Sequence, residues 1–224
     1  MSLRVLVLAM AIAVAGCPKP RHTLVPEVPM SGDAQARQRF EAARDRFKKG
    51  GGQAEEFRAI AVEYPGDPIE PFALLYAGMA AEQGGDHAAA AKSLEQVVGD
   101  DDAEPGLRRR AQLYLGLAEG AQGHQAKAVA LLADAEPAIE NDDERGAWLA
   151  AMAHGKAAGP APLDALPFFD RWWKLATGPE QAFIRVRVGE LVAGASAADA
   201  AAAWKAIGDD GAGPSVAILG WRIA

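Results

Sequence analysis

The residue types that most often carry chemistry are few and far apart in this sequence. Its four histidines, His22, His87, His124 and His154, stand singly, and none belongs to a hydrolase or zinc motif. A zinc site needs several closely spaced His or Cys ligands, and the sequence has no such cluster. We therefore expect no catalytic residue, no metal site and no cofactor, in a protein that is not an enzyme.

Two acidic segments contain the residue types of calcium loops but not their spacing. They are GDDDAEP (99–105) and NDDE (141–144). An EF-hand loop alternates its ligands around a central glycine, which neither segment does. Both segments precede predicted helices, where acidic side chains accept hydrogen bonds from free N–H groups and face the positive end of the helix dipole. Helix capping is the prediction for both.

The only cysteine, Cys17, directly follows a short apolar segment. Arg4, the apolar run 5–14 and two small residues have the layout of a secretory signal peptide over residues 1–16. As a helix, the apolar run is about 15 Å long, half of what a bilayer core requires. The segment VAGC (14–17) resembles the lipobox of bacterial lipoproteins. The resemblance implies that Cys17 is lipidated, with fatty chains such as palmitate, and becomes the first residue of the mature protein.

The lipidated cysteine and a proline-rich spacer form residues 17–30. Four prolines in this segment favour an extended polyproline II conformation, which holds the folded part away from a membrane. In the lipoprotein family, an aspartate after the cysteine retains the protein in the inner membrane, and here that position is Pro18. The resemblance therefore implies the outer membrane, with the protein facing the periplasm. The alternative is an ordinary secreted protein in which Cys17 is an incidental free thiol.

The net charge excludes one class of partner. It is −7 for the whole chain, and removal of residues 1–16, which contain Arg4 and no acid, gives −7 − 1 = −8. A chain this acidic lacks the basic surface that binds nucleic acid. With 50% hydrophobic residues it can bury a core, and 224 residues fit one domain.

Residues 31–224 are predicted to fold as helices only, so the predicted fold class is all-α. Apolar residues recur at helical spacing, and Gly or Pro clusters separate the segments. Ser31 or Asp33 can cap a first helix that ends at 48–52, and a second helix ends at 64–68. Further helices are predicted at 69–83, 87–98, 105–121, 124–136, 142–156, 163–176, 180–193, 197–207 and 214–224.

Two of these helix pairs repeat each other. Residues 78–97 align with residues 116–135 at a constant offset of 116 − 78 = 38. Small residues match in the middle of both helices of the pair, and a leucine follows: Gly78 with Gly116, Ala90 with Ala128, Leu94 with Leu132. A glycine allows the paired helix to approach closely, and the leucine fills the remaining space. Gly155 and Gly189 are predicted to continue this role.

This pattern resembles the tetratricopeptide repeat (TPR), and the match covers most of residues 33–224. The resemblance implies a right-handed α-solenoid of about five TPR-like helical hairpins plus a closing helix. In that family the first helices line a concave groove that binds partner segments. The corresponding groove positions in this chain are Phe72, Leu75, Met79, Arg110, Leu113 and Leu117. Because a short superhelix can also bury this face itself, both alternatives stay open.

One aromatic segment, PFFDRWWKL (167–175), is a second candidate for partner binding. Adjacent residues on a helix point about 100° apart, so Trp172 and Trp173 cannot both face the same way. Aromatic stripes usually pack between helices. Exposed tryptophan, on the other hand, often anchors a protein partner.

Together these features predict a non-enzymatic, lipid-anchored TPR-like adaptor or scaffold that mediates protein–protein interactions in the bacterial cell envelope. FRAIAVEYPGDP (57–68), with the helix around Gly78, resembles repeat units of periplasmic and outer-membrane TPR lipoproteins. These include the barrel-assembly type, the Tol–Pal coordinator type and the N-terminal half of penicillin-binding-protein activators. The envelope partner is not identified by the sequence. The alternatives are a ligand-binding or regulatory lipoprotein acting on peptidoglycan synthesis, and a purely structural envelope lipoprotein.

Overall fold

A computed structural model describes residues 28–207 and 213–223, which form helices joined by short loops and contain no strand. The predicted all-α fold class is confirmed. The α-helices are α1 (Ala34–Lys48), α2 (Ala54–Glu63), α3 (Glu70–Gln83), α4 (His87–Val98), α5 (Pro105–Ala121), α6 (Gln125–Leu132), α7 (Asp142–Ala157), α8 (Leu166–Leu175), α9 (Gly178–Gly194), α10 (Ala197–Ile207) and α11 (Pro214–Ile223). Two short 3₁₀ helices, η1 (Glu136–Ala138) and η2 (Pro162–Ala165), precede α7 and α8.

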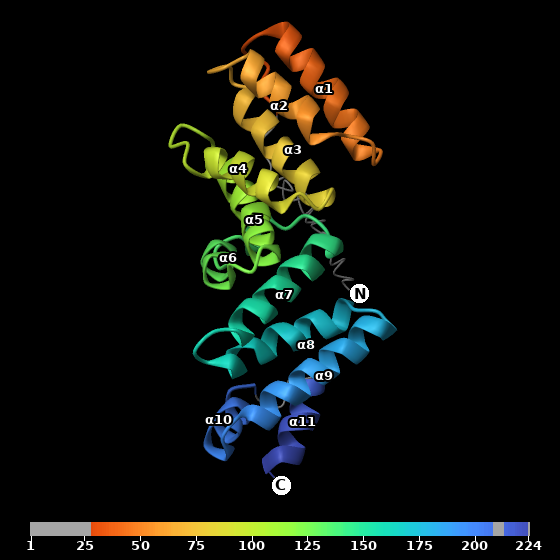
Figure 1. Cartoon of the computed structure of the whole chain (residues 1–224), viewed down its shortest axis with the longest axis vertical. Helices are drawn as coiled ribbons and strands as arrows, with labels where there is room; N and C mark the ends of the chain where they lie inside the picture. Colours follow the sequence, from red (N-terminus) through yellow and green to blue (C-terminus); the bar gives the residue numbers. More distant parts are fainter. Residues whose placement is uncertain (1–27, 208–212, 224) are drawn as a thin grey trace, which may run out of the picture.

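The helices follow one another along the long axis of the molecule, from α1 at one end to α10 and α11 at the other (Figure 1). From α1 to α9 each helix contacts the next, and α3 also contacts α5, which contacts α7. The last helices pack differently: α9 lies mainly on α8 and α11, and α10 lies on α11 and η2. The predicted fifth hairpin, α9 with α10, is therefore not a tight pair like the earlier ones.

Capping side chains and glycines mark the ends of several helices where the sequence predicts them. The Asp33 carboxylate caps α1 by accepting hydrogen bonds from the N–H groups of Gln35 at 2.7 Å and Ala36 at 2.9 Å. Gly85 and Gly123 follow α3 and α5 with φ angles of 78° and 86°, a left-handed conformation that favours glycine. The predicted bounds of α4, α5 and α10 are the observed ones.

Two helices differ from their predicted ranges by three residues or more at one end, and a proline lies at each of these differences. The helix predicted at 124–136 ends as α6 at Leu132, and Pro137 lies in η1. Proline has no N–H to donate and disfavours the helical conformation of the residue before it. The helix predicted at 163–176 starts as η2, and α8 begins only at Leu166, which places Pro167 in its first turn.

The close approach predicted at two glycines is confirmed. A Cβ atom at Gly78 would lie 2.4 Å from Cγ of Leu94, and a Cβ atom at Gly116 would lie 2.6 Å from Cγ of Leu132. Both leucines are fully buried. Gly78 lies on α3 and Leu94 on α4, while Gly116 lies on α5 and Leu132 on α6, so the same contact occurs twice, 38 residues apart.

The extension of this role to Gly155 and Gly189 is wrong. A Cβ atom at Gly155 would lie 2.3 Å from Cγ2 of Val129, which belongs to the preceding helix α6 and not to the helix that follows. A Cβ atom at Gly189 would have no heavy atom within 4 Å. The repeat therefore weakens after α6.

The buried hydrophobic side chains form two clusters. The larger one extends from Ala36 to Met152, through α1–α7, and the smaller one extends from Ala153 to Leu219, at the C-terminal end. Phe168 and Trp172 pack against both clusters, so α8 joins them. Burial of apolar surface in these clusters is the main force that holds the helices together.

Candidate functional site

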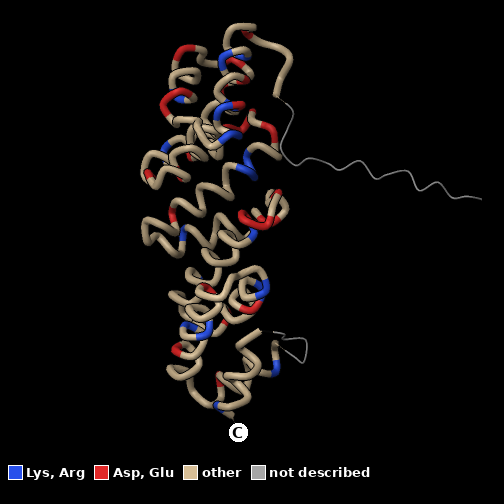
Figure 2. Tube along the Cα trace, turned by 90° about the vertical axis from the view of Figure 1, so that its right-hand side faces the viewer, with Lys and Arg blue, Asp and Glu red and all other residues tan. Residues whose placement is uncertain are grey.

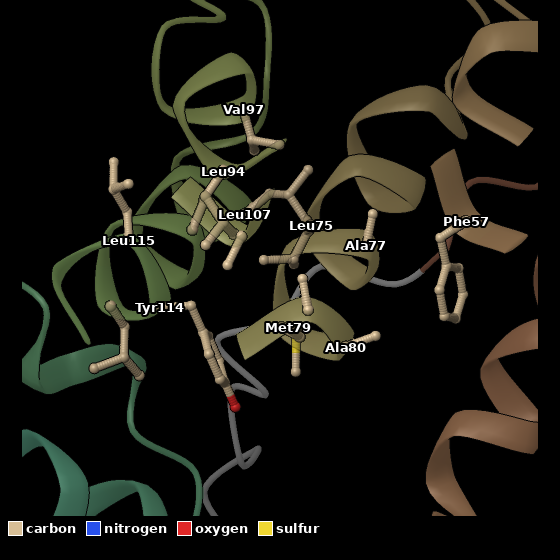
Figure 3. Close-up of a cluster of buried hydrophobic side chains, with 14 of the residues drawn as sticks. Phe57, Leu75, Ala77, Met79, Ala80, Leu94, Val97, Leu107, Tyr114 and Leu115 are labelled. Atoms are coloured by element: carbon tan, nitrogen blue, oxygen red, sulfur yellow. The ribbon is translucent and has the colours of Figure 1, made fainter. Parts of the chain in front are cut away.

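The side chains predicted to line a groove lie in the hydrophobic core. Five of them are buried, and the sixth, Leu117, is half-buried: the five are Phe72, Leu75, Met79, Arg110 and Leu113. Figure 3 shows Leu75 pointing toward Leu94 and Leu107, in the space between α3, α4 and α5. An open groove along these positions is therefore wrong, because neighbouring helices cover this face. Of the two alternatives left by the sequence, the structure has the self-buried face.

Arg110, the one charged member of that set, belongs to a buried ion pair that connects α5 to α7. Its guanidinium forms two hydrogen bonds with the Glu144 carboxylate, the longer being 2.7 Å, and one with the carbonyl oxygen of Ala138 at 2.6 Å. The Tyr114 hydroxyl donates to the same carboxylate at 2.7 Å. The Glu140 N–H also donates to Glu144, at 2.9 Å. The Arg110 guanidinium also pairs with the exposed Glu140 carboxylate, at 3.3 Å.

The protonation of this group follows from its contacts. Burial alone would raise the pKa of Glu144, but the hydrogen bonds from Arg110, Glu140 N–H and Tyr114 outweigh it and hold that pKa below its usual value. Burial raises the pKa of the Tyr114 hydroxyl far above its usual value. Glu144 is therefore ionised and Tyr114 neutral near neutral pH. Because the group is enclosed, it fixes α7 on α5 and offers no surface to a substrate.

Asn141 and Glu144 show what the sequence could and could not predict here. Capping is confirmed for residues 141–144, where the Asn141 side-chain oxygen accepts a hydrogen bond from the Glu144 N–H at 2.9 Å. For residues 99–105 the prediction is wrong, because Glu104, which precedes α5, makes no side-chain capping hydrogen bond. The pairing of Glu144 with Arg110, 34 residues earlier, was not predicted. The only sequence signal for it is an arginine inside an otherwise apolar helix face, which needs an acidic partner if it is buried.

The histidines do not converge on a site. His87 contacts Glu82 at 2.7 Å and His124 contacts Glu119 at 2.6 Å, at corresponding turns after α3 and α5. His154 lies among aromatic rings instead, and burial and the nearby Arg187 lower its pKa. His22 lies outside the described residues, as does Cys17. Within residues 28–207 and 213–223, no three His, Cys, Asp or Glu side chains are placed to hold a metal ion.

The two tryptophans of α8 are both half-buried. The ring of Trp172 lies between Phe169 and Phe183, with centroids 6.2 Å away in both cases, and so packs α8 against α9. Trp173 has the guanidinium of Arg185 5.2 Å from its ring centroid. Packing between helices therefore accounts for Trp172 and, in part, for Trp173.

A cleft of about 700 Å³ lies between η2, α9 and α10. We call it the C-terminal cleft. Its volume is within the range of sites that enclose small ligands. Its lining is mostly apolar: Ala157, Pro160, Ala161, Pro162, Leu163, Pro167, Leu191, Gly194, Ala195, Ala202, Ala203, Ala206 and Ile207. The remaining lining residues are Asp164, Glu190, Ser196 and Asp199.

The charge of the C-terminal cleft is uniformly negative. Three of its lining residues are carboxylates and none is Lys or Arg. The two acidic residues Asp164 and Asp199 have no ion-pair partner among the described residues, whereas Glu190 pairs with Arg187 on its own helix. Elsewhere acidic and basic positions are interspersed along the stack (Figure 2). The cleft therefore combines negatively charged side chains with a mostly apolar lining.

A second, smaller cavity of about 500 Å³ lies at the end of the molecule, between α10 and α11. Its lining residues are apolar: Trp204, Val216, Ala217, Gly220 and Trp221. The Trp221 side chain is 91% exposed. This cavity has no polar side chain that could orient a ligand.

No family model, curated protein or solved structure matches this chain. Among the described helices, none is long and apolar enough to cross a bilayer.

Proposed function

We propose that this protein is a non-enzymatic, lipid-anchored adaptor of the bacterial cell envelope, built as a right-handed α-solenoid of TPR-like hairpins. The observation that carries the repeat architecture is the contact of Gly78 with Leu94 and its equivalent between Gly116 and Leu132, 38 residues later. A unit of two helices at this period is typical of helical solenoids. The contacts of α3 with α5 and of α5 with α7 fit the same architecture, in which equivalent helices lie side by side.

The lipid anchor on Cys17 is supported by the sequence VAGC at the end of a short apolar segment. Each buried lipid CH₂ contributes about 0.8 kcal/mol, and stable anchoring needs at least two fatty chains, which a lipidated cysteine supplies. In this proposal the anchor holds the protein at the outer membrane, facing the periplasm, and the spacer 18–30 separates the helices from the lipid.

Replacement of Cys17 tests the proposed location at the membrane. Cys17→Ser is expected to move the protein from the membrane fraction to the soluble fraction and to abolish labelling with a palmitate analogue. The control is Ser31→Ala, which changes an exposed residue beyond the spacer and keeps the cysteine. A Cys17→Ser protein that stays in the membrane fraction contradicts the lipid anchor.

The adaptor role predicts a protein partner in the envelope. Crosslinking in intact cells is expected to give the same partner repeatedly with the wild type and less of it with Cys17→Ser, which is no longer held at the membrane. A wild-type protein with no recurrent partner would instead be a purely structural lipoprotein.

A second candidate function, binding of a small ligand or regulation of peptidoglycan synthesis, is favoured by the volume of the C-terminal cleft. Peptidoglycan fragments carry carboxylates, however, and the cleft presents Asp164, Glu190 and Asp199. Because like charges repel, this rim disfavours such fragments. Saturable binding of a muropeptide, measured by tryptophan fluorescence, would place this candidate ahead of the adaptor.

A further inference from the structure

The C-terminal cleft lies at the last helix pair, in which the fourth glycine of the series, Gly189, is not covered. In the regular pairs a leucine sixteen residues after the glycine fills the space between the helices, as Leu94 does for Gly78. The position sixteen residues after Gly189 is Lys205, which is exposed. The helices α9 and α10 are not packed closely on each other, and residues of both line the cleft.

Helix ends add to the negative charge of the cleft. Ala157 is the last residue of α7, and Gly194 is the last residue of α9, and both line it. The C-terminal end of a helix carries a partial negative charge and attracts cations. The N-terminal end of α10, which carries a partial positive charge, also lies at the cleft. Its capping position is taken by Ser196, whose hydroxyl accepts a hydrogen bond from the Asp199 N–H at 3.1 Å. One cation of the chain already lies at the C-terminal end of α9, since the Arg222 guanidinium donates to the carbonyl oxygen of Ala195 at 3.5 Å.

We infer that the C-terminal cleft binds an extended peptide segment of a protein partner in which a Lys or Arg side chain stands next to apolar residues. The cation lies between Asp164 and Asp199, and the apolar side chains lie on Leu163, Leu191 and Ile207. Charge complementarity selects the cation, because the lining has carboxylates and no Lys or Arg. The apolar lining selects a peptide over a bare amine, because only a peptide brings apolar surface to bury.

This inference rests on the proposed adaptor function, since it takes a protein as the partner, but it does not depend on Cys17. Loss of the anchor is measured by membrane fractionation, and loss of the cleft is measured by peptide binding, so the two failures are distinguishable.

The test begins with a random heptapeptide library displayed on phage and selected against the full chain in detergent. Enriched peptides are expected to contain Lys or Arg beside Leu, Ile, Val, Phe or Pro. Ala202→Trp, which fills the cleft from an exposed position on α10, is expected to remove the enrichment while the melting temperature stays unchanged. Enrichment of acidic or neutral peptides, equal enrichment on Ala202→Trp, or no enrichment overturns the inference.

The second step measures one enriched peptide, labelled with fluorescein, by anisotropy. Asp164→Asn combined with Asp199→Asn is expected to weaken binding about tenfold and to reduce its dependence on salt, because two charge interactions are removed. The matched control, Asp101→Asn combined with Asp134→Asn, removes two exposed carboxylates away from the cleft and is expected to leave the affinity unchanged. Equal affinity of the cleft variant and the wild type overturns the assignment. Binding of spermidine as tight as that of the peptide also overturns it, since the cleft would then take a small amine.

Discussion

Glycine occupies the middle of α3, α5 and α9, yet only the first two of these glycines are covered by a neighbouring helix. Leu94 lies over Gly78 and Leu132 over Gly116, whereas Gly189 has open space around it. The position that supplies leucine in the first two pairs is Lys205 in the last. A long, strongly hydrated ammonium side chain does not fill an apolar gap between two helices. In α3, α5 and α9, the glycine is packed closely against the following helix only where a leucine is present sixteen residues later.

The two regions also differ in what their helix pairs leave accessible to solvent. In α3–α6 the paired helices close over apolar side chains, and even the positions expected to face a partner are buried. In α8–α11 the pair α9 and α10 does not close, and the C-terminal cleft lies between η2 and these two helices. The C-terminal cleft thus lies where the repeat is broken and not where it is best preserved.

The largest effect is expected where the two regions meet, at the buried ion pair that holds α7 on α5. Glu144→Gln removes the buried counter-charge of the Arg110 guanidinium and leaves only the exposed Glu140 carboxylate, 3.3 Å away. Breaking a buried pair costs about 3–5 kcal/mol. The measurement is the free energy of unfolding from urea titration followed by circular dichroism.

A matched double variant separates the loss of a pair from the loss of packing. Arg110→Met combined with Glu144→Leu replaces both charges by apolar groups of similar size, which is often neutral or stabilising. It is expected to be clearly more stable than Glu144→Gln. A Glu144→Gln protein as stable as the wild type would mean that the ion pair does not hold α7 on α5.

The second effect compares the same substitution in the two regions. Gly78→Ala places a Cβ atom 2.4 Å from Cγ of Leu94, and such overpacking is expected to lower the free energy of unfolding by about 1–3 kcal/mol. Gly189→Ala meets nothing within 4 Å, so it is expected to raise stability by about 0.5–1 kcal/mol through its higher helix propensity. Thermal and urea unfolding of both variants measure the contrast.

A further variant tests the cause of the Gly78→Ala loss. Shortening the covering side chain, in Gly78→Ala combined with Leu94→Ala, removes the clash, so the two substitutions are expected to cost less together than the sum of their separate costs. Strict additivity would show that the two positions are not in contact. Equal behaviour of Gly78→Ala and Gly189→Ala would remove the distinction between the two regions.

The sequence predicts the helices well because their ends depend on local chemistry. Asp33 caps α1 through its own side chain, and Gly85 and Gly123 adopt conformations that other residues avoid. The burial of Leu75 and Arg110 could not be predicted in this way, because it depends on helices that lie far along the chain. The difference between Leu94 and Lys205 was visible in the sequence, but the C-terminal cleft could not be predicted, because it depends on how α9, α10 and η2 are placed.

The smallest effect is a contrast in pH dependence between two carboxylates, Asp170 on α8 and Glu144 on α7. Burial raises the pKa of Asp170 on α8, although its carboxylate accepts a hydrogen bond from the Ser215 N–H at 3.1 Å, in the first turn of α11. A raised pKa means that the folded state prefers the neutral acid, so this contribution to stability is present below about pH 3.8 and is lost as the pH rises through the folded pKa. Glu144 has a lowered pKa, so its contribution is present above about pH 4.5 and is lost as the pH falls through the folded pKa.

Asp170→Asn keeps an oxygen that can accept from the Ser215 N–H and removes the charge. It is expected to be more stable than the wild type at pH 7, and this gain is expected to shrink toward pH 4, where the wild-type carboxyl becomes protonated. Glu144→Gln is expected to behave in the opposite way, with its cost greatest at pH 7 and smaller in acid. Urea unfolding at pH 4, 5, 6 and 7 measures both. A gain from Asp170→Asn that is equal at all four pH values would show that the carboxyl is solvated, and that α11 does not bury it as the structure describes.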